Sequence, residues 1–467
     1  MILNFRNLPP LFIFLVFFIL FFAISLYRYD SAQLFHYDFG IFASIIWQLS
    51  QGKIAIINHI SLGRIIFLGD HFQPSLAILS PLFWIVKDVR ILLAEQAFVL
   101  AASSFLIYLI ALRKSLSKWS ALIFSIIFLL YAGIEFPVVS DWHPEPTAGL
   151  FLLLFIYFFL YSKRKIIPLI LAIIFLGFKE SNALTLSFFL ISSLFIYPKR
   201  LKEILFYLGS CLLWFFGAIN IFIPFFAHRS YFYAPQLPKN IVQLGESFGD
   251  IKKYNFVVQS ILSFGFLPFF AKFGLIPVIG EIMLRILPLR SFFQNFTLGL
   301  HYNVYLGIFL ALATLNGFIF IINKFQIKKY NVIFACIFLA FSILVAKRIT
   351  ISPVVVVTNK IFWQELKPRE EIFQSLSKVP SQGSIASQNN LLPYLVLRND
   401  NVVLIDKGYR TKDPQIIVFD LTAGQNPNNF FPKDYNFFVQ EKNSLEKHSS
   451  YKRLSTNNKN FYIYVKK

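Results

Sequence analysis

Long apolar runs separated by short polar connectors dominate the chain up to about residue 347. Apolar runs of about 17–25 residues have the length of helices that cross the hydrocarbon core of a bilayer. The pattern predicts about eleven membrane-spanning helices, several of them short enough to be tilted, broken or only partly inserted. The expected spans are 8–27, 90–112, 119–136, 147–161, 165–178, 183–197, 203–226, 256–271, 273–290, 303–323 and 330–347.

Two apolar runs near the N-terminus need separate interpretations. The run 8–26 follows Arg6, is long for the core of a signal peptide, and leads into a polar loop without a small-residue cleavage pattern. We therefore expect it to be retained as the first membrane span. The run 74–86 has only 13 residues, which favours an interfacial or re-entrant helix.

Basic residues are concentrated in short connectors between the apolar runs. Cytoplasmic loops of membrane proteins carry an excess of Lys and Arg. Eleven spans place all the basic connectors on one side, together with Arg6 and Lys272, so we expect a cytoplasmic N-terminus and an extracytoplasmic C-terminal region. The connectors are 113–118, 163–165, 199–202 and 324–329.

The character of the chain changes near residue 348, where long apolar runs give way to short alternating segments. Residues 363–377 have helical apolar spacing. We expect a transmembrane domain over 1–347, with a long first outer loop at 28–89, and a small extracytoplasmic α/β domain over 348–467. The expected strands are 383–388, 401–406, 415–420 and 461–465.

Composition supports a polytopic α-helical membrane protein. Hydrophobic residues make up 57% of the 467 residues and charged residues only 14%, with a mean hydropathy of +0.63. Soluble domains carry about a quarter charged residues. The net charge of +21 follows from the basic connectors and indicates contact with membrane lipid, with no nucleic-acid partner.

Polar clusters stand out on the predicted outer side. Ionisable groups at the edge of a membrane are costly and usually face a cavity or a partner. Carboxylates and imidazoles that converge there could act as general acids and bases or hold a divalent cation, and a lysine could neutralise phosphate. The candidate residues are Asp38, Asp70, His71, Asp141, His143, Glu145, Lys179, Glu180 and His301.

Structural roles remain open for the same residues. Asp38 and Asp70 are also suited to cap short interfacial helices, and Asp141 to Glu145 could form a solvated loop before a helix that starts at a proline. Lys179 and Glu180 are adjacent, so they do not face each other on a helix and could each pair with another segment. His301 could be a packing residue. The triplet Asp38-Phe39-Gly40 matches a protein-kinase motif, but only 37 residues precede it, which excludes a kinase.

A set of short motifs follows in order along the chain: Tyr37 to Phe42 with Trp47, Leu68 to Pro74, Ser80 to Leu82, Glu95-Gln96, Asp141 to Glu145, Lys179-Glu180, His301-Tyr302, Ala386-Ser387, Leu392-Pro393 and Arg398. Taken together in that order, they resemble the domain-of-unknown-function 2079 family of prokaryotic polytopic membrane proteins. Ala43 and Ser44 stand where relatives often carry Asp-Gln, and loss of that second acid argues against a two-carboxylate metal site confined to this loop.

That family looks like a branch of the GT-C superfamily of membrane glycosyltransferases. The resemblance implies transfer of a sugar from a polyprenyl-phosphate-linked donor to an envelope acceptor, with Asp38, or else Asp70, as catalytic base. His71, His143 and Lys179 would contact the donor phosphate, and Glu145 or Glu180 would orient them or assist a divalent cation such as Mg²⁺ or Mn²⁺. A transporter or flippase of a lipid-linked or anionic solute, or a non-catalytic envelope-assembly subunit, is the alternative.

Overall fold

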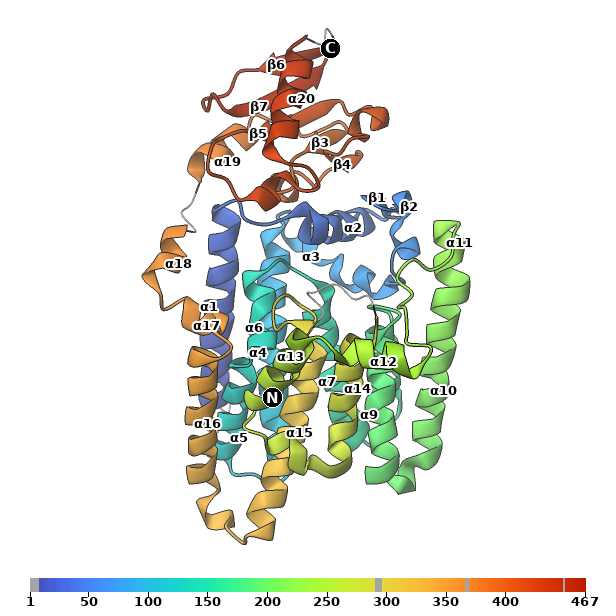
Figure 1. Cartoon of the computed structure of the whole chain (residues 1–467), viewed down its shortest axis with the longest axis vertical. Helices are drawn as coiled ribbons and strands as arrows, with labels where there is room; N and C mark the ends of the chain where they lie inside the picture. The colour runs from blue at the N-terminus through green and yellow to red at the C-terminus, as the bar shows by residue number, and fades with distance from the viewer. Residues whose placement is uncertain (1–7, 290–295, 366–368, 448–449) are drawn as a thin grey trace.

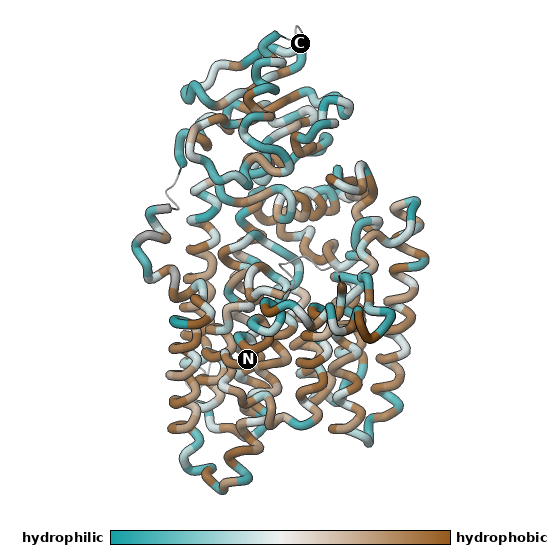
Figure 2. Tube along the Cα trace, in the orientation of Figure 1, coloured by the Kyte–Doolittle hydropathy of each residue, from teal (hydrophilic) through white to brown (hydrophobic). Residues whose placement is uncertain are grey.

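The computed structural model describes residues 8–289, 296–365, 369–447 and 450–467. A bundle of long helices carries a layer of loops at one end, and a small sheet domain lies on top of that layer (Figure 1). Apolar residues colour most of the bundle brown in Figure 2, whereas the sheet domain is richer in hydrophilic residues. Among the described residues, seven helices are long and apolar enough to cross a membrane, or eight with one bent pair. The expected multi-pass helical architecture is confirmed.

The helices of the bundle follow the predicted apolar runs closely. Residues 118–139 form a span that bends by 50° between α5 and α6. The helices are α1 (Leu8–Asp30), α4 (Arg90–Arg113), α5 (Lys118–Leu129), α6 (Ala132–Val139), α7 (Pro144–Tyr161), α8 (Ile166–Leu176), α9 (Asn182–Ile196), α10 (Leu201–Gly217), α11 (Ile223–Ala227), α14 (Ile276–Ile286), α15 (Val304–Lys324) and α16 (Asn331–Arg348).

The four basic connectors meet at one end of this bundle. Arg113 Nε donates to the hydroxyl of Tyr157, and the Arg200 guanidinium stacks over the Phe159 ring near the end of α7. Ser117, between α4 and α5, donates to the Asn331 side chain at the start of α16. We call this the basic end; the opposite end, which carries the sheet domain, is the domain end (Figure 1).

The span expected at 256–271 is not one continuous helix. Two short helices, α12 (Ile241–Phe248) and α13 (Ile251–Leu262), precede a break in which Gly265 and Phe266 have positive φ angles of 63° and 60°. Pro268 then starts a run of 3₁₀ turns, Leu267–Leu275, that leads into α14. A left-handed turn followed by proline cannot continue an α-helix, which explains the difference. Residue 290 of the next expected span lies outside the described residues.

The first loop forms the layer between the bundle and the sheet domain (Figure 1). It contains a π-helical turn (His36–Gly40), helix α2 (Ile41–Ser50), and an antiparallel hairpin of β1 (Ile56–His59) and β2 (Gly63–Ile66). The run expected to be interfacial or re-entrant forms a 3₁₀ segment (Pro74–Leu79) and the short helix α3 (Leu82–Ile85). Trp84 in α3 is 66% exposed and donates its ring N–H to the carbonyl of Ser50.

The sheet domain contains a mixed five-stranded sheet in the order β4-β3-β5-β7-β6, with β3, β4 and β5 parallel. All four expected strands are present, and β6 was not expected. The helix expected at 363–377 is divided between α18 and α19, and residues 366–368 lie outside the described residues. Helices α17 (Pro353–Val356) and α18 (Lys360–Glu365) lie beside the bundle, where the Val354 N–H donates to Glu135 of α6 (Figure 1). The elements of the domain are α19 (Glu370–Leu376), β3 (Ile385–Ser387), β4 (Val402–Leu404), β5 (Ile416–Asp420), α20 (Tyr435–Lys447), β6 (Tyr451–Leu454) and β7 (Phe461–Lys466).

The sheet domain contacts the loop layer through the turn after β3. The Asn389 side-chain oxygen accepts hydrogen bonds from the backbone N–H groups of His36, at 3.0 Å, and Tyr37, at 3.2 Å. Asn390 donates to the carbonyl of Ala32, and Tyr394 donates its hydroxyl to the carbonyl of Tyr29 at the end of α1. The domain therefore holds the segment that leads into the turn containing Asp38 and the first two residues of that turn.

Candidate active site

Five separate segments bring the predicted polar residues to the domain end of the bundle. Asp38 lies in the π-helical turn of the first loop, Asp70 and His71 follow the 3₁₀ turn Phe67–Gly69, and His143 and Glu145 lie at the start of α7. Lys179 and Glu180 occupy the connector between α8 and α9, and His301 precedes α15. The proline at the first position of α7 has no backbone N–H to lose, so the helix can begin where it presents Glu145.

The lysine cluster consists of His143, Glu145, Lys179 and His301. One Glu145 oxygen lies 3.1 Å from the Lys179 ammonium, and the other accepts from the Nδ1 of His143 in a short contact. The rings of His143 and His301 stack face to face with centroids 3.2 Å apart. Burial opposes the charge of Lys179, but Glu145 and Glu180 outweigh it and raise the pKa of the ammonium. The cluster thus holds one fixed positive charge next to a shared carboxylate.

Asp38 faces the lysine cluster and is only partly buried. Burial raises the pKa of its carboxyl, Glu145 adds to this effect, and His143 and Lys179 oppose it. Among the described residues, the Asp38 carboxylate forms no ion pair of 4.0 Å or less, so its oxygens stay available to a ligand. Gly40 allows the turn to close, because a Cβ atom there would collide with the His36 ring.

The Glu180 cluster consists of Asp70, His71, Glu180, Tyr231 and Tyr233. Glu180 accepts from His71 Nδ1 at 2.8 Å, from the Tyr231 hydroxyl at 2.7 Å and from the backbone N–H of Phe72 at 3.1 Å. Burial alone would raise the pKa of Glu180, but His71 and these hydrogen bonds lower it to about 2. Burial likewise opposes the charge of His71, and Glu180 reverses the effect and raises its pKa. Each group of the pair therefore stabilises the charged form of the other.

Asp70 lies on the other side of the same cluster. Its Oδ1 accepts from the Tyr233 hydroxyl at 2.7 Å, and the Tyr233 ring stacks on His71 with centroids 4.4 Å apart. One carboxylate oxygen of Asp70 thus already accepts a hydrogen bond from Tyr233, whereas the carboxylate of Asp38 has no such bond among the described residues. The side chains of Lys179 and Glu180 point to different clusters, as expected because adjacent residues do not face each other. Since the two residues are consecutive, the two clusters lie side by side.

Asp141 is separate from both clusters. It forms an ion pair with Arg28 at 3.2 Å and accepts from the backbone N–H of Phe35 at 3.0 Å. Burial raises the pKa of its carboxyl to about 7, against the attraction of Arg28. Asp141 therefore ties the end of α1 and the first loop to the segment before α7, a positioning role.

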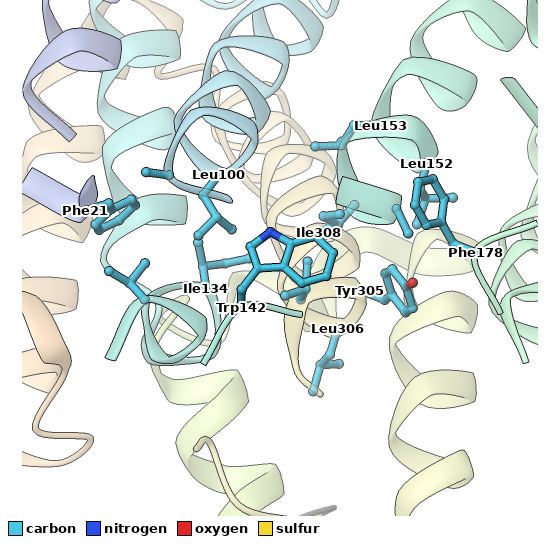
Figure 3. Close-up of a cluster of buried hydrophobic side chains, with 14 of the residues drawn as sticks. Phe21, Leu100, Ile134, Trp142, Leu152, Leu153, Phe178, Tyr305, Leu306 and Ile308 are labelled. Carbon is cyan, nitrogen blue, oxygen red and sulfur yellow. The ribbon is translucent and has the colours of Figure 1, made fainter. Parts of the chain in front are cut away.

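The neighbouring Trp142 fixes that segment in the core. Its indole is fully buried and packs among Leu100, Ile134 and Leu306 (Figure 3). The indole N–H donates to a Glu95 oxygen at 2.9 Å. Gln96 accepts from the backbone N–H of His143 at 3.0 Å. The core packing and the two hydrogen bonds hold His143 and Glu145 in place against α4.

His143, Glu145 and His301 offer ligand atoms that all lie within 4.8 Å of one another. Two imidazoles and a carboxylate match the ligand types that Zn²⁺ and similar divalent ions take. All three residues are buried, and Glu145 already contacts both His143 and Lys179. The donor set fits a divalent ion, whereas an all-oxygen site of the kind preferred by Mg²⁺ is not formed by these three residues.

Three residues that position the site were not predicted from the sequence. Tyr231 and Tyr233 lie in an irregular loop after α11, where two tyrosines among aromatic residues carry no distinctive pattern. Asn389 lies 353 residues from His36, and no local signal links them. Only the presence of Tyr-x-Tyr in a loop assigned to the same side could have suggested the first two.

The family model described as "Predicted membrane protein (DUF2079)" matches residues 28–466. No curated protein matches the chain. The chain is similar in structure to ArnT from Cupriavidus metallidurans bound to undecaprenyl phosphate, with a TM-score of 0.53 and 12% identity over 97% of each chain. The apo state of the same protein gives a TM-score of 0.50 and 12% identity over 96% of this chain and 97% of that one. The likeness shows that the chain shares the overall fold of ArnT, in agreement with the polytopic helical fold expected from the sequence.

Proposed function

The chain belongs to the DUF2079 family of predicted membrane proteins, and we propose that it is a glycosyltransferase that takes a sugar from a polyprenyl-phosphate-linked donor at the domain end. The observation that carries the proposal is the position of Asp38. Its partly exposed carboxylate faces a partly buried lysine and two histidines in a fold like that of a protein bound to undecaprenyl phosphate. Fold likeness alone does not give a function, so the residues must carry the chemistry.

Asp38 is the proposed general base. Its free oxygens could accept the proton of an acceptor hydroxyl as that oxygen attacks the anomeric carbon and the bond to the phosphate oxygen breaks. Its raised pKa makes it a stronger base once ionised than an ordinary aspartate. Asp70 is the second choice, because the Tyr233 hydroxyl already occupies one of its oxygens.

Lys179, His71 and His143 are the proposed contacts of the donor phosphate. Lys179 and His71 carry positive charge, and each is oriented by its own carboxylate, Glu145 or Glu180. Preorganised donors of this kind stabilise the negative charge that develops on a leaving phosphate. A divalent ion held by His143, Glu145 and His301 would add further positive charge at the same place.

Release of polyprenyl phosphate tests the proposal. Purified protein in proteoliposomes is given radiolabelled undecaprenyl-phosphate sugars and a prokaryotic envelope fraction as acceptor. We expect labelled product and free undecaprenyl phosphate from the wild type, loss of both in Lys179→Gln, and no change in Lys163→Gln at the exposed basic end. Transport of intact donor across the bilayer without cleavage would contradict the proposal and favour the flippase alternative.

A further inference from the structure

A polar pocket lies between the first loop and the sheet domain. The loop side is formed by α2 and the β1–β2 hairpin, and the domain side by residues 399–402 at the start of β4. Its volume is about 190 Å³, more than ten times the roughly 10–15 Å³ that one water needs. His36, two residues before Asp38, is part of its lining. The pocket therefore adjoins the turn that carries the proposed base.

Hydrogen bonds between the two sides fix the pocket walls. The Asn58 side-chain nitrogen donates to the Asn401 side-chain oxygen at 2.5 Å and to the carbonyl of Val402 at 2.8 Å. On the loop side, the Gln48 side chain bonds both the N–H and the carbonyl of Ile56, which joins α2 to the hairpin. These hydrogen bonds fix the position of the first loop relative to the sheet domain on either side of the pocket.

One buried polar atom of a lining residue, the side-chain oxygen of Asn58, has no hydrogen-bond partner among the described residues. Because the Asn58 nitrogen already donates to two oxygens, its amide orientation is settled, and the remaining oxygen needs a donor. Buried polar atoms are almost always hydrogen-bonded in folded proteins. A hydroxyl group is a natural donor to an amide oxygen.

The charge of the pocket favours an anion. Lys53 and Arg64 line it and are exposed, and among the described residues neither forms an ion pair. Asp400, the one acidic residue of the lining, accepts a hydrogen bond from the backbone N–H of Gly383. Two cations face one carboxylate, so a ligand with negative charge is attracted.

We propose that this pocket binds an acidic saccharide, one of whose hydroxyl groups donates to Asn58 and whose anionic group pairs with Lys53 and Arg64. The bound saccharide would be the acceptor of the sugar, a role that rests on the function proposed above. Binding itself does not depend on that function, because it uses residues outside both the lysine cluster and the Glu180 cluster.

Calorimetric titration of the full-length protein in detergent tests the site. The probes are a disaccharide containing glucuronic acid, a neutral disaccharide of the same size, and inorganic phosphate. We expect the acidic disaccharide to bind, and Arg64→Gln to weaken it roughly tenfold through loss of a charge-assisted contact. Ser44→Val on the pocket wall should also weaken it, and Arg164→Gln at the basic end should not.

Several results would overturn the proposal. They are absence of binding by the acidic disaccharide, equal binding of the neutral one, or equal binding of inorganic phosphate, which would make the pocket a simple anion site. If the acidic disaccharide binds as expected but no sugar transfer occurs, the site stands and only its role as acceptor site is lost. That outcome separates this inference from the proposed function.

Discussion

The Lys179 ammonium lies 3.1 Å from the Glu145 carboxylate, although the two residues are 34 positions apart and come from different helix ends. Glu180, the next residue, turns instead to His71. Two consecutive residues thus organise two adjoining polar clusters at the domain end of the bundle.

Removal of one partner of the largely buried Lys179–Glu145 pair, in which the Lys179 side chain is 19% exposed, should destabilise the protein more than removal of both. Breaking a buried pair typically costs about 3–5 kcal/mol because one charge is left unpaired. We expect Lys179→Met to lower the free energy of unfolding by about 3 kcal/mol. The value is at the low end of the range because His143 still contacts Glu145 in this variant. The double variant with Glu145→Gln should recover part of the loss in thermal unfolding in detergent. Additive losses would show that the pair is not coupled.

The His71–Glu180 pair should make stability depend on pH. The lowered pKa of Glu180 gives stability that is present above 4.5 and is lost as the pH falls toward about 2. The raised pKa of His71 gives stability that is present below 6.5 and is lost as the pH rises through the folded value. The difference in Tm between wild type and Glu180→Gln should therefore be largest between about pH 4.5 and 6.5. A difference that stays constant with pH would refute this account of the pair.

Asn389 should hold the turn that contains Asp38. Its side-chain oxygen accepts the N–H groups of His36 and Tyr37, and the His36 N–H also donates to the backbone carbonyl of Asn389 at 2.8 Å. Both amides should exchange hydrogen slowly, but only the Tyr37 amide depends on the side chain. We expect Asn389→Ala to speed exchange of the Tyr37 amide at least roughly tenfold, and Asn389→Asp, which keeps the acceptor, to change it little. Hydrogen-exchange mass spectrometry of peptides covering 34–42 measures this, with Asn457→Ala at the outer edge of the sheet domain as control. Unchanged exchange in Asn389→Ala would remove the positioning role.

The two ends of the bundle should face opposite sides of the membrane. With the exposed Cys336 replaced by serine, single cysteines at Lys53 and Asn399 should react with an impermeant thiol reagent on intact cells. A cysteine at Lys163 should react only after permeabilisation, because basic connectors are cytoplasmic. The reverse pattern would place the polar clusters on the cytoplasmic side.

Hydropathy and charge anticipated most of the architecture, because bilayer thickness dictates span length and the lysines and arginines mark one end. The break at Gly265 and Pro268 was not anticipated, because the apolar run continues through it and hydropathy does not register backbone conformation. The strands β3, β4, β5 and β7 followed from short alternating segments. β6 has mixed polar and half-buried positions and gave no such signal.

The candidate site was anticipated only in part. His143, Glu145, Lys179 and His301 were assigned to one side by topology, and the structure brings them together. Asp141 was grouped with them by sequence proximity, but it turns away to Arg28. Contacts across hundreds of residues, such as Asn389 with His36, depend on tertiary packing that no local pattern reveals.

The turnover rate of Asp38→Asn tests directly whether Asp38 is the general base. The variant keeps the size of the side chain and removes its basicity, and Asp88→Asn in the same loop is the matched control because Asp88 pairs only with its neighbour Arg90 among the described residues. We predict that kcat for sugar transfer falls by roughly 10²–10⁴, the usual contribution of a general base, while KM for the donor changes little. A kcat in Asp38→Asn equal to that of Asp88→Asn would contradict the account.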